Sequence, residues 1–124
     1  MSAKDGDAAP DQALLESFAE EARRRCDVIA AGLATESADF ETMRTEAHAL
    51  KGTASVVGLR RLAELAGLME SDLAEAKKTG LIRGGRSHQI ADAAKALADG
   101  ATAAAEGKEE PPDVGRSLAQ LFSA

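Results

Sequence analysis

With 124 residues and a formal charge of −6, the chain is long enough for one acidic domain with a single core, but not for two cores. One cysteine excludes an intramolecular disulfide and any multi-cysteine metal site, and the lack of a basic face with interleaved aromatic residues argues against nucleic-acid binding. No segment approaches the ~18 apolar residues of a membrane span and the N-terminus has no apolar signal region, so we expect a cytoplasmic protein that binds no membrane.

The composition also indicates the fold class. Apolar residues make up 44% of the chain, but there is no Trp or Tyr and there are only three Phe, so the core must be mainly aliphatic. Alanine is abundant and strict apolar–polar alternation is almost absent, which indicates an all-α protein. The small and polar residues 1–10 are typical of a disordered lead-in.

The first predicted helix begins near Asp11 and ends near Ala34. Its buried stripe repeats at three- and four-residue spacing and consists of Leu15, Phe18, Ala22, Cys26, Ile29 and Leu33. Because Cys26 belongs to this stripe, we interpret it as a small core residue and not as a redox group.

The second and third helices are separated by a single glycine. The second is capped by Ser37 or Asp39 and closed by Gly58, where a C-terminal glycine is expected. The third carries a leucine-rich stripe and stops before Gly80. The short link predicts that the two helices are antiparallel neighbours.

A glycine-rich loop then leads to a fourth helix, for which Ser87 is the expected N-cap. This helix is weakened by Gly100 and is nearly all alanine in its second half, so we expect its end to fray. Together the four helices predict an antiparallel four-helix bundle over residues 11–106. Residues 107–124 form a hinge and a short amphipathic segment, which either docks as a fifth helix or hangs free; its apolar residues are Val114, Leu118, Leu121 and Phe122.

The candidate functional residue is His48, in the second helix. The apolar stripe of that helix consists of Phe40, Met43, Ala47, Leu50, Ala54 and Val57. At about 100° per residue, His48 projects roughly 130° away from the middle of this stripe. The same outward side carries Glu41, Arg44, Lys51, Gly52 and Ser55. An imidazole displayed on a rigid helix suits a reactive group that another protein approaches, and we interpret it as a phosphate-accepting histidine.

The neighbours of this histidine fit the same chemistry. Neutral imidazole is a good nucleophile toward phosphorus, and the Lys51 ammonium, one turn on, can stabilise the charge of a phosphoryl group in transit. Gly52 gives up roughly 1 kcal/mol of helix propensity, but it leaves room for a docking partner. His88 has no such neighbours, and we assign it no role.

The stretch from Ala47 to Leu73 resembles the histidine-containing phosphotransfer (HPt) family. The matching residues are His48, Leu50, Lys51, Gly52, Ala54, Ser55, Gly58, Leu62, Leu65 and Glu70. The upstream segment FAEEARRRCDVIAAGL is similar to the first bundle helix of the N-terminal phosphotransfer domain of chemotaxis histidine kinases. In those domains a second histidine often lies three residues before the acid, at the position that Gly67 occupies here.

The resemblance implies that His48 carries the phosphoryl group and that Glu70 accepts a hydrogen bond from its Nδ1, which leaves Nε2 as the attacking nitrogen. The implied partners are receiver domains of response regulators and a histidine kinase. Gly52, Ser55 and Arg44 are the expected docking residues. The chain itself needs no cofactor in this scheme, because the catalytic Mg²⁺ and aspartate belong to the receiver.

Several alternatives stay open at this point. Glu70 could instead form an ordinary surface ion pair with Lys77 or another cation. The chain could be a complete relay protein, which the tail after Pro112 favours, or a domain of a larger histidine kinase; it has no nucleotide-binding motif, so we expect no enzyme activity of its own. It could also be a helical adaptor or inhibitor that binds receiver or kinase domains without carrying phosphate. A metal-carboxylate bundle needs Glu-x-x-His pairs, which neither His48 nor His88 completes.

Overall fold

The computed structural model describes residues 11–123, so the lead-in expected over residues 1–10 lies outside the described part. The described chain forms five α-helices and no strand, which confirms the all-α prediction. They are α1 (Gln12–Leu33), α2 (Phe40–Val56), α3 (Arg60–Thr79), α4 (Arg86–Ala105) and α5 (Pro112–Phe122). Within this part of the chain, none of the helices combines the length and the hydropathy needed to cross a membrane.

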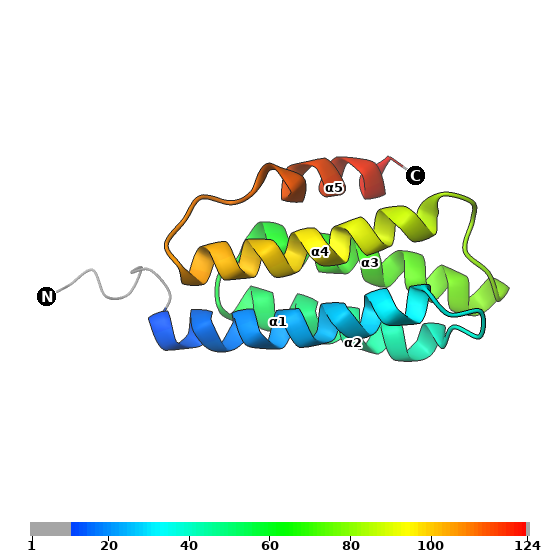
Figure 1. Ribbon diagram of the computed structural model, residues 1–124, viewed down its shortest axis with the longest axis horizontal. Helices are drawn as coiled ribbons and strands as arrows, with labels where there is room; N and C mark the ends of the chain where they lie inside the picture. The colour runs from blue at the N-terminus through cyan, green and yellow to red at the C-terminus, as the bar shows by residue number, and fades with distance from the viewer. Residues whose placement is uncertain (1–10, 124) are drawn as a thin grey trace, which may run out of the picture.

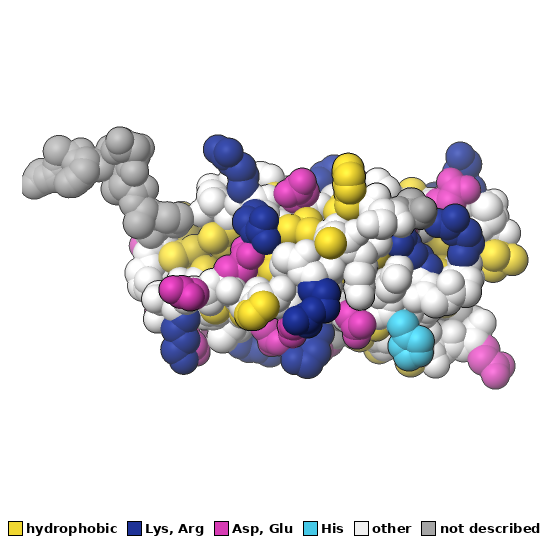
Figure 2. Space-filling model, turned by 90° about the horizontal axis from the view of Figure 1, so that it is seen from above, with side chains coloured by type: hydrophobic (Ala, Val, Ile, Leu, Met, Phe, Trp, Pro, Cys, Tyr) yellow, Lys and Arg dark blue, Asp and Glu magenta, His cyan; other side chains and the backbone are white. Residues whose placement is uncertain are grey.

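The first four helices run up and down in an antiparallel bundle (Figure 1). Around the bundle, α1 packs against α2 and α4, and α3 packs against the same two helices from the other side. The short fifth helix docks along α3 and α4, so the C-terminal segment does not hang free. On the side seen from above, Lys and Arg side chains alternate with Asp and Glu, and apolar side chains lie between them (Figure 2).

The helix ends of the first half follow the sequence signals. The carboxylates of Asp11 and Asp39 accept hydrogen bonds from backbone N–H groups of the first turns of α1 and α2. Gly58 has a φ of 82° and closes α2, with the N–H of Leu59 donating to the carbonyl of Ala54 at 2.9 Å. This left-handed closure turns the chain directly into α3, and it sets α2 and α3 side by side.

The expected N-cap of α4 was wrong. The helix begins at Arg86 after Gly85 (φ 80°), and no side chain caps it, so Ser87 lies inside its first turn. The helix continues to Ala105, where a left-handed Gly107 closes it and the N–H of Lys108 donates to the carbonyl of Ala103 at 2.8 Å; fraying of this end stays a prediction.

Gly100 also has a structural reason within α4. A β-carbon at this position would lie 2.9 Å from Leu62 of α3 and 3.2 Å from Val114 of α5. The glycine therefore costs α4 some helix propensity but allows three helices to approach closely.

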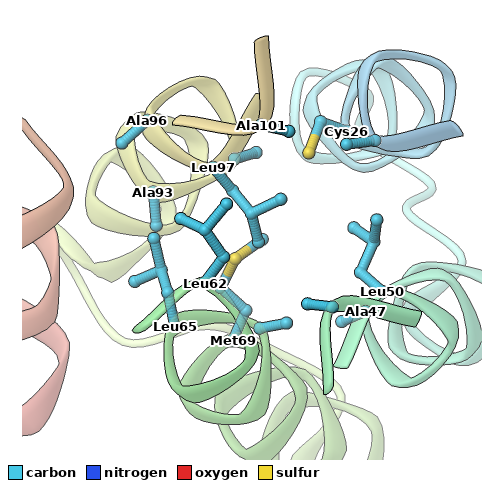
Figure 3. Close-up of a cluster of buried hydrophobic side chains, with 14 of the residues drawn as sticks. Cys26, Ala47, Leu50, Leu62, Leu65, Met69, Ala93, Ala96, Leu97 and Ala101 are labelled. Atoms are coloured by element: carbon cyan, nitrogen blue, oxygen red, sulfur yellow. The ribbon is translucent and has the colours of Figure 1, made fainter. Parts of the chain in front are cut away.

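The core lies where the predicted stripes meet. In Figure 3, Leu97 of α4 and Met69 of α3 point into the same interior space, which Leu50 of α2 and Cys26 of α1 also line. Cys26 is 3% exposed, which confirms that this cysteine is a core residue, and its burial raises the pKa of the thiol to about 12. The largest fully buried side chains are Phe18, Ile29, Met43, Leu50, Leu65, Met69, Leu73, Ile90, Leu97 and Val114.

The fifth helix is held by a buried arginine that the sequence did not single out. The guanidinium of Arg86 donates to the carbonyls of Leu121 at 2.7 Å and Gln120 at 3.1 Å, and its Nε lies 2.8 Å from Asp72 of α3. A cation at these last carbonyls also interacts favourably with the helix dipole. Of the apolar residues of this amphipathic segment, Val114 and Leu121 are buried, whereas Phe122, the last residue of α5, is 78% exposed.

Candidate functional site around His48

The orientation of α2 decides where its histidine points. Met43, Ala47, Leu50 and Ala54 are fully buried, or nearly so, against the other helices of the bundle. This burial fixes the rotation of the helix about its axis and turns the opposite side to solvent. The side chain of His48 is therefore 63% exposed, on a helix that is anchored from end to end.

The partner of the imidazole comes from α3. Nδ1 of His48 lies 2.9 Å from Oε2 of Glu70. A carboxylate only accepts hydrogen bonds, so a neutral ring in this contact carries its proton on Nδ1. Among the described residues, Nε2 has no hydrogen-bond partner, and it is the ring nitrogen left with a free lone pair.

The same carboxylate also binds the lysine of α2. Nζ of Lys51 lies 2.9 Å from Oε1 of Glu70, so the two oxygens of one carboxylate hold the imidazole and the ammonium. Burial acts to raise the pKa of Glu70, but the hydrogen bonds from Lys51 and His48 outweigh it and lower that pKa. Glu70 is therefore ionised at neutral pH and bears a full negative charge beside the ring.

Arg44 and Lys77 form their shortest ion pairs with a neighbouring acid, Glu41. Nη2 of Arg44 lies 3.0 Å and Nζ of Lys77 lies 2.9 Å from the carboxylate of Glu41, and together they lower its pKa to about 2. Arg44 reaches Glu70 only at 3.5 Å, through Nη1. The alternative pair between Glu70 and Lys77 is therefore wrong, because Lys77 binds Glu41, about two helical turns farther along the bundle, whereas the pair between Glu70 and another cation is present in the contact with Lys51.

The surface next to the histidine is open. A β-carbon at Gly52 would meet nothing within 4 Å, so this glycine leaves free space one turn from His48. Ser55 is exposed, and its hydroxyl donates to the carbonyl of Lys51 at 2.9 Å. Val56, which the sequence analysis did not single out, is 81% exposed and adds an apolar side chain to the same end of α2. In the sequence, the signal for an exposed Val56 is its position directly before Val57, which belongs to the buried stripe of α2.

The remaining histidine lies elsewhere. His88 is exposed in the first turn of α4, and the described residues place no ion-pair partner beside it. Within residues 11–123, no group of three or more His, Cys, Asp or Glu side chains is placed to hold a metal ion.

Comparison with known proteins agrees with this fold. The family model described as "Hpt domain" matches residues 13–121, nearly the whole chain. No curated protein and no solved structure matches the chain. The chain belongs to the Hpt domain family, whose members are helical bundles that act as phosphocarrier modules in phosphorelays.

Proposed function

We propose that this chain carries a phosphoryl group on Nε2 of His48 and exchanges it with aspartates of response-regulator receiver domains, with a histidine kinase as a further partner. The observation that carries the proposal is the contact between Nδ1 of His48 and Glu70, at 2.9 Å, on a side chain that is 63% exposed. The contact fixes the ring, and the exposure lets a second protein reach Nε2.

The transfer of the phosphoryl group to His48 does not require a proton to leave the imidazole ring. The lone pair of Nε2 attacks the phosphorus of an aspartyl phosphate, an N–P bond forms, and the P–O bond to the aspartate breaks. The aspartate leaves as a carboxylate, and the ring becomes a cation that keeps its proton on Nδ1. The negative charge of Glu70 stabilises this cation, so the carboxylate contributes more in the transition state than in the neutral resting state.

The cations and the open surface complete the proposal. Lys51 supplies a positive charge one turn from His48, where it can offset charge on the phosphoryl oxygens in transit. Gly52, Ser55 and Arg44 are the proposed docking residues, and the exposed Val56 extends that surface with an apolar contact. The catalytic Mg²⁺ belongs, in this proposal, to the receiver, and this chain binds no cofactor of its own.

The test is incubation with a panel of phosphorylated receiver domains. The expected product is an acid-labile, alkali-stable phosphate on the chain, which is lost in His48→Gln and kept in the matched variant His88→Gln. Labelling that survives in His48→Gln contradicts the assignment. A receiver that binds the chain but never labels it supports the alternative, an adaptor or inhibitor that carries no phosphate.

A further inference from the structure

The backbone conformation at Gly67 of α3 does not require a glycine. The glycines with positive φ in the described chain are Gly58, Gly80, Gly85 and Gly107, and Gly67 is not among them. It lies inside a 20-residue helix, where glycine costs about 1 kcal/mol relative to alanine. Its reason must therefore lie in the space that a side chain would occupy.

That space borders the lysine of the site. A β-carbon at Gly67 would lie 3.3 Å from Cδ of Lys51, and no other atom outside the surrounding backbone comes within 4 Å. The contact is closer than an ordinary van der Waals approach between carbons. Beyond Cδ, the lysine continues to Nζ, which lies 2.9 Å from Oε1 of Glu70. Gly67 and Glu70 are three residues apart and so lie on neighbouring parts of one helix face.

We propose that Gly67 is a positioning residue: its missing side chain lets the aliphatic stem of Lys51 lie across α3, so that the ammonium rests on Glu70 beside His48. A large side chain at position 67 displaces the stem from α3, and the ammonium leaves Oε1. Glu70 then keeps His48 and the more distant Arg44, but it loses its second close donor.

The primary test needs no phosphorylation. The side-chain carboxyl carbon of Glu70 is followed by ¹³C NMR against pH in the wild type, Gly67→Leu, Lys51→Met and the double variant. The hydrogen bond from Lys51 lowers the pKa of Glu70, so its loss moves the midpoint upward. We expect Gly67→Leu to raise the titration midpoint of Glu70, as Lys51→Met does. In the double variant, the midpoint should be the same as in Lys51→Met alone.

Two results would overturn the proposal. An unchanged midpoint in Gly67→Leu means that the lysine reaches Glu70 whatever occupies position 67. A rise that is equally large in the Lys51→Met background means that the leucine acts on Glu70 directly. Gly52→Leu is the matched control for the titration, because a side chain there meets open space and leaves Lys51 in place. Should Gly67→Leu not fold, Gly67→Ala takes its place in the cycle, with a smaller rise expected.

A second experiment connects this inference to the proposed function. Unlike the titration of Glu70, this experiment rests on the proposed function. The rate of phosphoryl transfer from a receiver is measured for the same four proteins, and Gly67→Leu should change it in the direction of Lys51→Met, with no further change in the double variant. Additive changes would contradict the proposal. If even the wild type takes no label, the proposed function fails, while the titration still decides the role of Gly67.

Discussion

Glu70 accepts from Nδ1 of His48 at 2.9 Å across a helix–helix interface, although the two residues are 22 positions apart in the chain. The contact depends on the tight closure of α2 at Gly58, which brings α3 back alongside α2. It leaves Nε2 open to solvent, and it places a partly buried negative charge behind the ring.

Replacing Glu70 with Gln tests what that charge does. The amide keeps the shape and can still accept a hydrogen bond, but it no longer stabilises a cationic ring. Because a hydrogen bond to a charged group contributes about 1.5–3 kcal/mol, we expect phosphorylation of His48 to slow by about tenfold or more, yet not to stop. The ring ¹⁵N shifts should show fewer molecules with the proton on Nδ1. Equal rates and an unchanged tautomer ratio would leave Glu70 as a surface acid.

Substitutions at Gly52 should affect the stability of the bundle and the binding of a receiver separately. Gly52→Ala should stabilise the bundle by up to about 1 kcal/mol, because the β-carbon meets open space and improves helix propensity. Gly52→Gln should melt close to the wild type and yet bind a receiver more weakly, since its side chain fills the space beside His48. Thermal unfolding and titration calorimetry measure the two effects. Normal binding by Gly52→Gln would place the docking surface elsewhere.

Arg86 is expected to hold α5 on the bundle. Arg86→Met removes the donor for two α5 carbonyls and leaves Asp72 without its cation, which we expect to cost about 2–4 kcal/mol of unfolding free energy in urea. Backbone amides of α5 should then exchange with deuterium faster, while those of α2 change less. Full protection of α5 in the variant would mean that apolar packing alone holds the helix.

Acid should weaken the contacts between α2 and α3. The folded-state pKa values of Glu41 and Glu70 lie below their ordinary value of 4.5, with Glu41 at about 2. Each carboxylate therefore stabilises the fold above about pH 4.5, and this stabilisation is lost as the pH falls toward 2. The difference in unfolding free energy between the wild type and Glu41→Gln should shrink over that range. A difference that stays constant from pH 6 to pH 2 would contradict these ion pairs.

The sequence was enough to predict the helices and the face that each one buries, because apolar spacing and capping residues are local signals. The stripe of α2 also placed His48 on the outer face, as the structure has it. Helical spacing places Glu70 next to the apolar stripe of α3. This spacing alone does not distinguish His48 from Lys77 as the partner of the Glu70 carboxylate. That choice depends on the register of α3 against α2, which the sequence does not state.

Other parts of the structure have no local signal at all. Arg86 follows two glycines in the sequence, which gives it the look of a solvated loop cation, yet it is the first residue of α4 and its acceptors include backbone carbonyls 34 and 35 residues farther along the chain. Gly67 looked only like the place of an absent histidine, and the stem of Lys51 above it became visible once the two helices were in register.

Two-dimensional ¹H–³¹P NMR distinguishes whether the phosphoryl group is bonded to Nε2 of His48, as proposed, or to Nδ1. After phosphorylation by a receiver, the phosphorus of an Nε2-linked group correlates with both carbon-bound protons of the imidazole, whereas an Nδ1-linked group correlates with Hε1 alone. We expect one phosphorus signal with both correlations in the wild type and none in His48→Gln. A signal coupled to Hε1 alone, or one that persists in His48→Gln, would contradict the proposal.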